Sequence, residues 1–233
     1  MIAGMSGWWV HDLYQAGRTV ELISWIFWVI FSITLHELAH GWAALWQGDD
    51  TPRRLGRMTG NPLVHMGPTS LLAFAIIGIA WGVMPVTPSR FRWGRRGRVV
   101  VSAAGPGMNI VLAVLALTLA VMWLAVGPQG QPVYRNAAVF LWTGGWLNLL
   151  LAGLNLLPVP PLDGSSILSG LSLRFYQLYQ RPQAAMIGMI VILVIFFSGC
   201  GGVVIAVFQT LCVLYVDLSG AMFGSPPILD VVY

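Results

Sequence analysis

The sequence predicts an all-α polytopic membrane protein, a bundle of about four to six transmembrane helices. Of its 233 residues, 57% are hydrophobic and only 9% are charged, against roughly 45–50% and about 25% in soluble globular domains. The mean hydropathy is +0.77, so too few charges are present to solvate a globular surface. The apolar content excludes a disordered chain, and a count of two cysteines excludes a disulfide scaffold.

Five apolar segments follow one another along the chain, and several reach the length of about 20 residues that a transmembrane helix needs. The last segment is too long for one span and is interrupted by glycines. It predicts either a helical hairpin or one kinked span followed by an interfacial helix. In order, the segments are residues 22–46, 69–86, 99–126, 137–157 and 184–222.

The basic residues predict an orientation in the membrane. All twelve are arginines, and ten of them lie within 53–57, 90–98 and 174–181, next to apolar segments. Arginine-rich loops favour the cytoplasmic side of a membrane, so we expect these ten in the cytoplasm and the protein in a cytoplasmic (inner) membrane of the bacterial type. Arginines that border apolar runs are typical of contact with lipid headgroups rather than with the phosphate backbone of a nucleic acid. We therefore expect no nucleic-acid partner.

This orientation places cytoplasmic arginines at both ends of residues 69–86. The segment is then expected to enter and leave on one side, as a re-entrant loop within residues 60–98, whose backbone must be buried in protein or line a wet cavity. The alternative is an ordinary span with one arginine cluster outside. Residues 81–86 are a candidate short β-edge, because Pro85 is tolerated at a sheet edge. The alternative there is the exit of the loop.

The first apolar segment contains the sequence His36-Glu37-Leu38-Ala39-His40, an H-E-x-x-H motif. Positions i and i+4 of a helix share a face, so both imidazoles can reach one metal ion. Glu37 can then accept a proton from a water whose pKa zinc lowers to about 7. In a chain of this composition about 0.0006 such matches arise by chance. The alternative is a trio of interior hydrogen-bonding residues, although ionisable groups at this depth are usually functional.

Two histidines leave a catalytic zinc site incomplete, since such sites usually have three protein ligands. Asp163 is the foremost candidate, because the preceding prolines break the helix and the extended chain could aim its carboxylate back into the bundle. An Asp-Gly pair alone would normally indicate a surface turn. The candidates for the third ligand are Asp163, Asp217, His65, His11, Asp49 and Asp50.

The H-E-x-x-H motif together with Asn155-x-x-Pro158-x-x-x-Leu162-Asp163-Gly164 resembles the paired signature of the site-2 protease family of intramembrane zinc metalloproteases. Similar stretches are Gly48–Thr51, Asn61–Pro68 and Ala104–Asn109, so the resemblance covers about residues 35–164. It implies one zinc ion per chain bound by His36, His40 and Asp163, with Glu37 as general base. It also implies that Asn155 lies near the scissile peptide.

The family's substrates are membrane-anchored proteins, often regulators, so the resemblance implies single-span membrane protein substrates within the lipid bilayer. We expect a single transmembrane metalloprotease domain over residues 1–233, with a catalytic core at about 22–164, a C-terminal helical region at 184–222, and room for neither a PDZ nor a CBS domain. No oligomeric state is predicted.

An unwound substrate needs backbone partners, which a strand edge supplies by β-augmentation. Trp81, Gly82 and Val83 are therefore candidate substrate-binding residues. His65 and Asn109 are candidates for supporting the metal ligands. For His65 an interfacial loop position is an equal alternative, and for Asn109 close helix packing beside small residues is favoured.

Two alternative functions could use the same histidine, glutamate and aspartate residues. A divalent-metal transporter would be expected to show two inverted halves, and the sequence has no such symmetry. A catalytically inactive homologue that binds membrane helices would be expected to lose Glu37 first, and Glu37 is intact.

Overall fold

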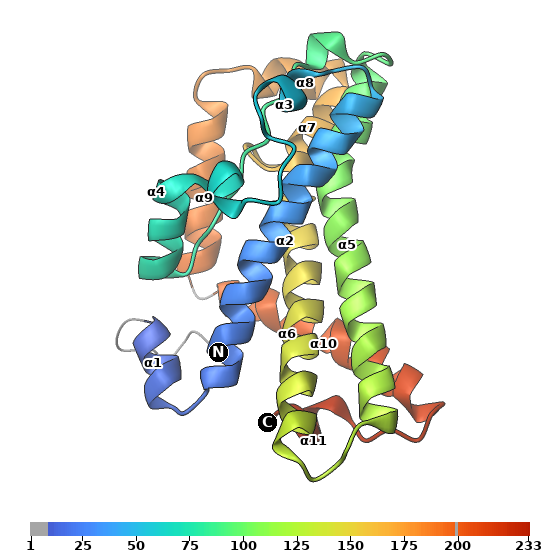
Figure 1. Ribbon diagram of the computed structural model, residues 1–233. Helices are drawn as coiled ribbons and strands as arrows, with labels where there is room; N and C mark the ends of the chain where they lie inside the picture. The colour runs from blue at the N-terminus through green and yellow to red at the C-terminus, as the bar shows by residue number, and fades with distance from the viewer. Residues whose placement is uncertain (1–8, 199) are drawn as a thin grey trace. The chain divides into compact units, whose positions relative to one another are not determined.

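The computed structural model describes residues 9–198 and 200–233, and within them it is helical with no β-strand (Figure 1). This confirms the predicted all-α class. A single 3₁₀ turn at Pro88–Arg90 accompanies the α-helices. These are α1 (Trp9–Gln15), α2 (Thr19–Trp46), α3 (Thr51–Arg54), α4 (Pro62–Ile77), α5 (Arg95–Val126), α6 (Pro132–Asn155), α7 (Asp163–Leu171), α8 (Leu173–Tyr179), α9 (Ala184–Phe197), α10 (Cys200–Ala221) and α11 (Ile228–Val232).

Four of the described helices, α2, α5, α6 and most of α10, are long and apolar enough to cross a membrane. Helices α8 and α9 are bent by 86° at a short break and could together form a fifth crossing. The number of spans agrees with the predicted four to six. The apolar region 184–222 is divided into two helices, α9 and α10.

The chain divides into two compact units. Among the described residues, one comprises residues 9–30, 110–150 and 201–233, and the other comprises residues 31–109, 151–198 and 200. In the first unit, Trp28 Nε1 donates a hydrogen bond of 2.8 Å to the Phe140 carbonyl. A Cβ atom on Gly144 would overlap the Trp28 ring, so glycine lets α2 and α6 approach closely there. Of the candidate site residues, His11 and Asp217 fall in the first unit and all the others fall in the second.

In the second unit, buried polar groups tie the end of α2 to the start of α5. Helix α2 stops at Gly48, whose φ of +92° is a left-handed conformation that favours glycine. The Gln47 carbonyl accepts from Arg92 N at 2.7 Å, and Gln47 Oε1 accepts from Trp93 N at 3.2 Å. Two candidate spans therefore end side by side.

Residues 49–87 connect these two spans and include α4; we call this connecting segment the excursion. Asn61 caps this helix by accepting from Leu63 N at 3.0 Å, and Gly67 kinks it with a φ of +68°. With 16 residues, α4 is shorter than an ordinary span. The returning chain donates from Thr87 N to Asp49 Oδ2 at 2.6 Å. The excursion thus leaves and rejoins the end of α2, which is the connectivity of the predicted re-entrant loop.

The predicted β-edge within this excursion does not form. Residues 79–87 have no regular structure, and no described segment lies beside them as a partner strand. Their backbone groups bond elsewhere. Ser70 Oγ donates to the Trp81 carbonyl at 2.7 Å and accepts from Trp81 N at 2.8 Å, and Val83 N donates to the His65 carbonyl at 3.0 Å. A ladder needs two strands, so these single bonds hold an extended segment without making a sheet.

Candidate metal centre

The two histidines of the H-E-x-x-H motif converge, as their spacing predicts. Both project from one face of α2, with their Nε2 atoms 3.1 Å apart and their rings nearly perpendicular at 83°. Both are buried among apolar residues of a candidate span. One helix thus supplies two nitrogen atoms directed to the same point.

Asp163 completes the group. It is the first residue of α7, and Leu162 before it is extended, so the carboxylate is delivered at the entry to the helix. Asp163 Oδ2 lies 3.1 Å from His36 Nε2 and 3.3 Å from His40 Nε2. Among the residues that the structure describes, these three form the one cluster able to hold a metal ion.

Hydrogen bonds to the opposite ring nitrogens fix the tautomers. The Val101 carbonyl lies 2.7 Å from His40 Nδ1 and can only accept, so that nitrogen carries the proton. Asn109 Oδ1 lies 2.5 Å from His36 Nδ1 and accepts in the same way. Each neutral imidazole then presents the lone pair of Nε2 to the other and to the carboxylate. A cation bound between these three atoms would offset their mutual repulsion.

The donor set fits zinc. Two imidazoles and a carboxylate are usual ligands of a catalytic zinc ion. Bonds of about 2.0–2.1 Å in a tetrahedron separate neighbouring ligands by about 3.3–3.4 Å, and the observed separations are 3.1–3.3 Å. Gly105 also lies against this point, because a Cβ atom there would overlap Nε2 of both histidines. The absence of a side chain at Gly105 keeps the point between the two rings open.

The carboxylate of Glu37 is buried beside the returning chain of the excursion. Glu37 is only 6% exposed, and a Cβ atom on Gly82 would come within 2.6 Å of its Cγ and Oε1 atoms. On either side of Gly82, Trp81 and Val83 are 47% and 55% exposed. The three candidate substrate-binding residues therefore pass directly over Glu37, with two apolar side chains available to a partner.

The surroundings of Asn109 and His65 differ from the alternatives considered for them. Asn109, fully buried in α5, bonds the His36 ring rather than only packing. His65 lies in α4 and is 2% exposed, not in an interfacial loop, and its Nε2 donates to the Thr59 carbonyl at 2.6 Å. Asn155, the last residue of α6, donates from Nδ2 to the Leu151 carbonyl at 3.0 Å. That bond uses one of its two amide hydrogens.

Three of the remaining candidate ligands, Asp49, Asp50 and Asp217, serve other contacts. Asp49 is completely buried and accepts from Thr51 N at 3.1 Å and from Thr87 N at 2.6 Å. Asp50 pairs with Arg90 at 2.7 Å, and Asp217 Oδ1 accepts from Ile228 N at 3.0 Å.

The sequence analysis missed two residues of the site, Val101 and Gly105. Val101 contributes its backbone carbonyl and Gly105 contributes by having no side chain, so neither could be recognised from side-chain chemistry.

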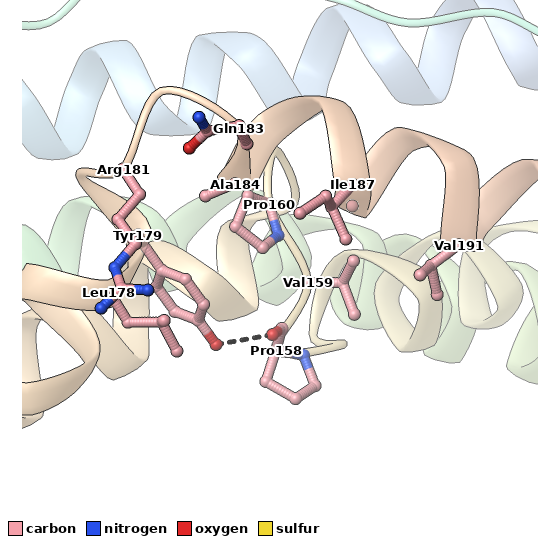
Figure 2. A pocket seen from close by; sticks show the side chains of 11 residues that line it. Pro158, Val159, Pro160, Leu178, Tyr179, Arg181, Gln183, Ala184, Ile187 and Val191 are labelled. Carbon is pink, nitrogen blue, oxygen red and sulfur yellow. Dashed lines mark hydrogen bonds between the residues drawn. The ribbon is translucent and has the colours of Figure 1, made fainter.

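An apolar pocket of about 460 Å³ lies beside the loop that leads to Asp163. Figure 2 shows Pro158, Val159 and Pro160 on one wall and residues of α8 and α9 on the other. The Tyr179 hydroxyl donates to the Pro158 carbonyl at 2.7 Å across one end. Gly188 allows α9 to approach this loop, because a Cβ atom there would overlap the Pro160 carbonyl.

Comparison with known proteins agrees with this chemistry. The profile of peptidase family M50 matches residues 124–198, which include Asp163. A Bacillus subtilis (strain 168) protein named "Putative zinc metalloprotease YwhC" is 36% identical over 181 residues, which cover 76% of this chain and 81% of YwhC. The chain belongs to peptidase family M50, the site-2 protease family.

Other relatives match over a smaller share of their own length. A protein of Mycolicibacterium smegmatis (strain ATCC 700084 / mc(2)155) named "Putative zinc metalloprotease Rip2" is 34% identical over 140 residues, 58% of this chain and 52% of Rip2. Zinc metalloprotease MJ0392 of Methanocaldococcus jannaschii is 26% identical over 181 residues, 75% of this chain and 44% of MJ0392. No solved structure matches the chain. Family membership and the apolar helices together make this an integral membrane protein of a zinc metalloprotease family.

Proposed function

We propose that the protein is an intramembrane zinc metalloendopeptidase that hydrolyses peptide bonds within or near transmembrane segments of membrane-anchored proteins, including regulatory ones. The observation that carries the proposal is the convergence of His36 Nε2, His40 Nε2 and Asp163 Oδ2 within 3.1–3.3 Å of one another. The buried Glu37 is the next residue on the same apolar helix. We expect one zinc ion per chain.

Each side chain has a distinct task in this proposal. When bound, zinc polarises the peptide carbonyl and makes water nucleophilic at neutral pH. Glu37 accepts the proton that the attacking water loses and passes it to the leaving amide nitrogen, so that one water adds across the broken C–N bond. The free amide hydrogen of Asn155 is available to hold the substrate backbone or the oxyanion.

The chain over Glu37 supplies a place for the substrate. A transmembrane helix hides its peptide bonds in its own hydrogen bonds, so it must unwind locally before it can be cut. Trp81 and Val83 offer half-exposed apolar side chains to such an unwound segment, one on each side of Gly82. The apolar pocket at Pro158–Pro160 can take side chains of the same substrate near Asp163.

One pair of substitutions tests the proposal. Glu37→Gln is expected to retain zinc, because it removes no ligand, and to abolish cleavage of a single-span substrate reconstituted in the same vesicles. Asp163→Ala is expected to lose both zinc and cleavage. Metal per chain is measured by elemental analysis and cleavage by the size of the product. Glu21→Gln is a matched control on the same helix, since Glu21 pairs with Arg18 outside the site.

Full cleavage by the Glu37→Gln protein would exclude Glu37 as general base. Zinc transport into vesicles by wild type, unchanged in Glu37→Gln, would favour the transporter alternative. Stoichiometric zinc without cleavage by wild type of any membrane-anchored substrate would favour the inactive homologue.

A further inference from the structure

A second pocket, separate from the metal centre, lies between the N-terminal end of α5 and the C-terminal end of α7. Its volume of about 780 Å³ falls in the range of about 300–1,000 Å³ typical of ligand sites. One part of its lining is basic and aromatic and the other is apolar. Its main lining residues are Trp93, Arg95, Arg96, Val99, Val100 and Leu171.

The positive charge of this pocket is not neutralised by the protein. Arg95 and Arg96 are both exposed, and neither has an ion pair within the described parts of the chain. The sequence contains no acidic residue between Asp50 and Asp163, and Asp50 already pairs with Arg54 and Arg90. Two adjacent guanidinium groups without a carboxylate favour an anionic ligand, and phosphate suits their donor geometry.

The pocket also lies where a membrane border is expected. The hydrogen bonds that Arg92 N and Trp93 N donate to Gln47 place the end of one candidate span beside the start of another. Trp93 packs edge-on against Trp46 with ring centroids 4.9 Å apart, and both are about half exposed. Exposed tryptophans at the ends of spans are typical of the lipid headgroup level.

We infer that this pocket binds an anionic phospholipid. Arg95 and Arg96 hold the phosphate, and Val99 and Leu171 lie against the first part of an acyl chain. A free phosphate or a soluble anion would use the arginines alone and leave the apolar wall exposed to water. The continuity of charge and apolar surface in one pocket therefore selects a lipid as the ligand.

A lipid in this position contacts the two helices that assemble the metal centre. Helix α5 carries Val101 and Asn109, which orient the histidines, and α7 begins at Asp163. The helices touch beside the pocket, where a Cβ atom on Gly170 would come within 2.9 Å of the Arg95 carbonyl. The lipid is therefore expected to stabilise the folded protein, because it binds the assembled helix pair.

Native mass spectrometry of the full chain in a nonionic detergent tests the inference, with phosphatidylglycerol and phosphatidylcholine titrated separately. Wild type is expected to bind one phosphatidylglycerol molecule in preference to phosphatidylcholine. The double substitution Arg95→Gln/Arg96→Gln is expected to weaken phosphatidylglycerol binding by about 30-fold, the effect of two arginine contacts at a lipid surface. Arg53→Gln/Arg174→Gln is the matched control, since it removes two exposed arginines elsewhere and is expected to leave binding unchanged.

A charge-preserving variant checks that loss of binding is not loss of folding. Arg95→Lys/Arg96→Lys is expected to retain the preference for phosphatidylglycerol. Equal loss in the lysine and glutamine variants, equal loss in the matched control, or wild-type binding by Arg95→Gln/Arg96→Gln would each overturn the inference. Competition by inorganic phosphate or soluble glycerophosphoglycerol at the concentration of the lipid would overturn it as well, since neither can use the apolar wall.

Discussion

Asn109 Oδ1 lies 2.5 Å from His36 Nδ1, so a residue of α5 sets the orientation of a ring carried by α2. The two residues are 73 positions apart in sequence, and both are buried. Because the bond fixes the proton on Nδ1, it directs the lone pair of Nε2 toward His40 and Asp163. The geometry of the candidate metal centre therefore depends on the packing of α5 against α2 as well as on its three candidate ligands.

Substituting Asn109 tests this dependence. Asn109→Ala is expected to lower zinc affinity by about 10- to 100-fold, the usual effect of removing a partner from a metal-bound histidine. Competition with a chelator of known affinity measures the change. Asn148→Ala is the matched control, because Asn148 is equally buried but donates to the Gly144 carbonyl of its own helix. A wild-type zinc affinity in Asn109→Ala would show that His36 needs no such partner.

Gly105→Ala is expected to abolish zinc binding by occupying the point where the three ligands converge. The added methyl group would overlap Nε2 of both His36 and His40. Gly107→Ala, two residues along the same helix, meets no atom within 4 Å and is expected to bind zinc normally. Metal content of the two purified proteins gives the comparison, and equal zinc in both would show that α5 can move away from the histidines.

Gly82→Ala separates catalysis from metal binding. Its methyl group would come within 2.6 Å of Glu37 Cγ and Oε1, so it displaces the proposed base while leaving the three ligands in place. We expect zinc content to stay near wild type and the cleavage rate to fall by about 100-fold or more, the usual contribution of a general base. Gly60→Ala, which meets no atom within 4 Å in the same excursion, is expected to keep activity. An active Gly82→Ala enzyme would argue that Glu37 is not held by this segment.

Asp49→Ala is expected to destabilise the folded protein. Its buried carboxylate accepts from Thr51 N and Thr87 N, and each backbone donor left without a partner costs about 1–3 kcal/mol. Thermal unfolding in detergent should show a lower midpoint. Asp50→Ala is the comparison at the neighbouring position, where the side chain is 54% exposed and its ion pairs contribute little. An unchanged midpoint for Asp49→Ala would show that the ends of the excursion are held by other contacts.

The sequence predicted the helical class, the spans and the three ligand candidates because these depend on local pattern. Apolar runs of about 20 residues predict membrane spans, and the i, i+4 spacing of His36 and His40 predicts that both side chains lie on one face of a helix. The prediction of a strand edge at residues 81–86 was wrong, because a strand forms only beside a partner segment, which local composition does not specify. Two alternatives raised from the sequence also missed the surroundings: packing alone does not account for the bond between Asn109 and His36, and His65 lies buried in a helix rather than in an interfacial loop. The environment of a lone polar residue is set by helices distant in sequence.

By itself, the sequence determined that two imidazoles and a glutamate would share one helical turn inside an apolar segment, because helix periodicity alone brings them together. The prolines before Asp163 and the resemblance of its motif favoured this aspartate, but only the tertiary structure brings its Oδ2 atom within 3.1–3.3 Å of both histidines. It also decided the tautomers, through the Val101 carbonyl and Asn109, and the open space at Gly105. Those features arise from the close approach of α2, α5 and α7, and contacts between helices far apart in the chain are not encoded in any local stretch.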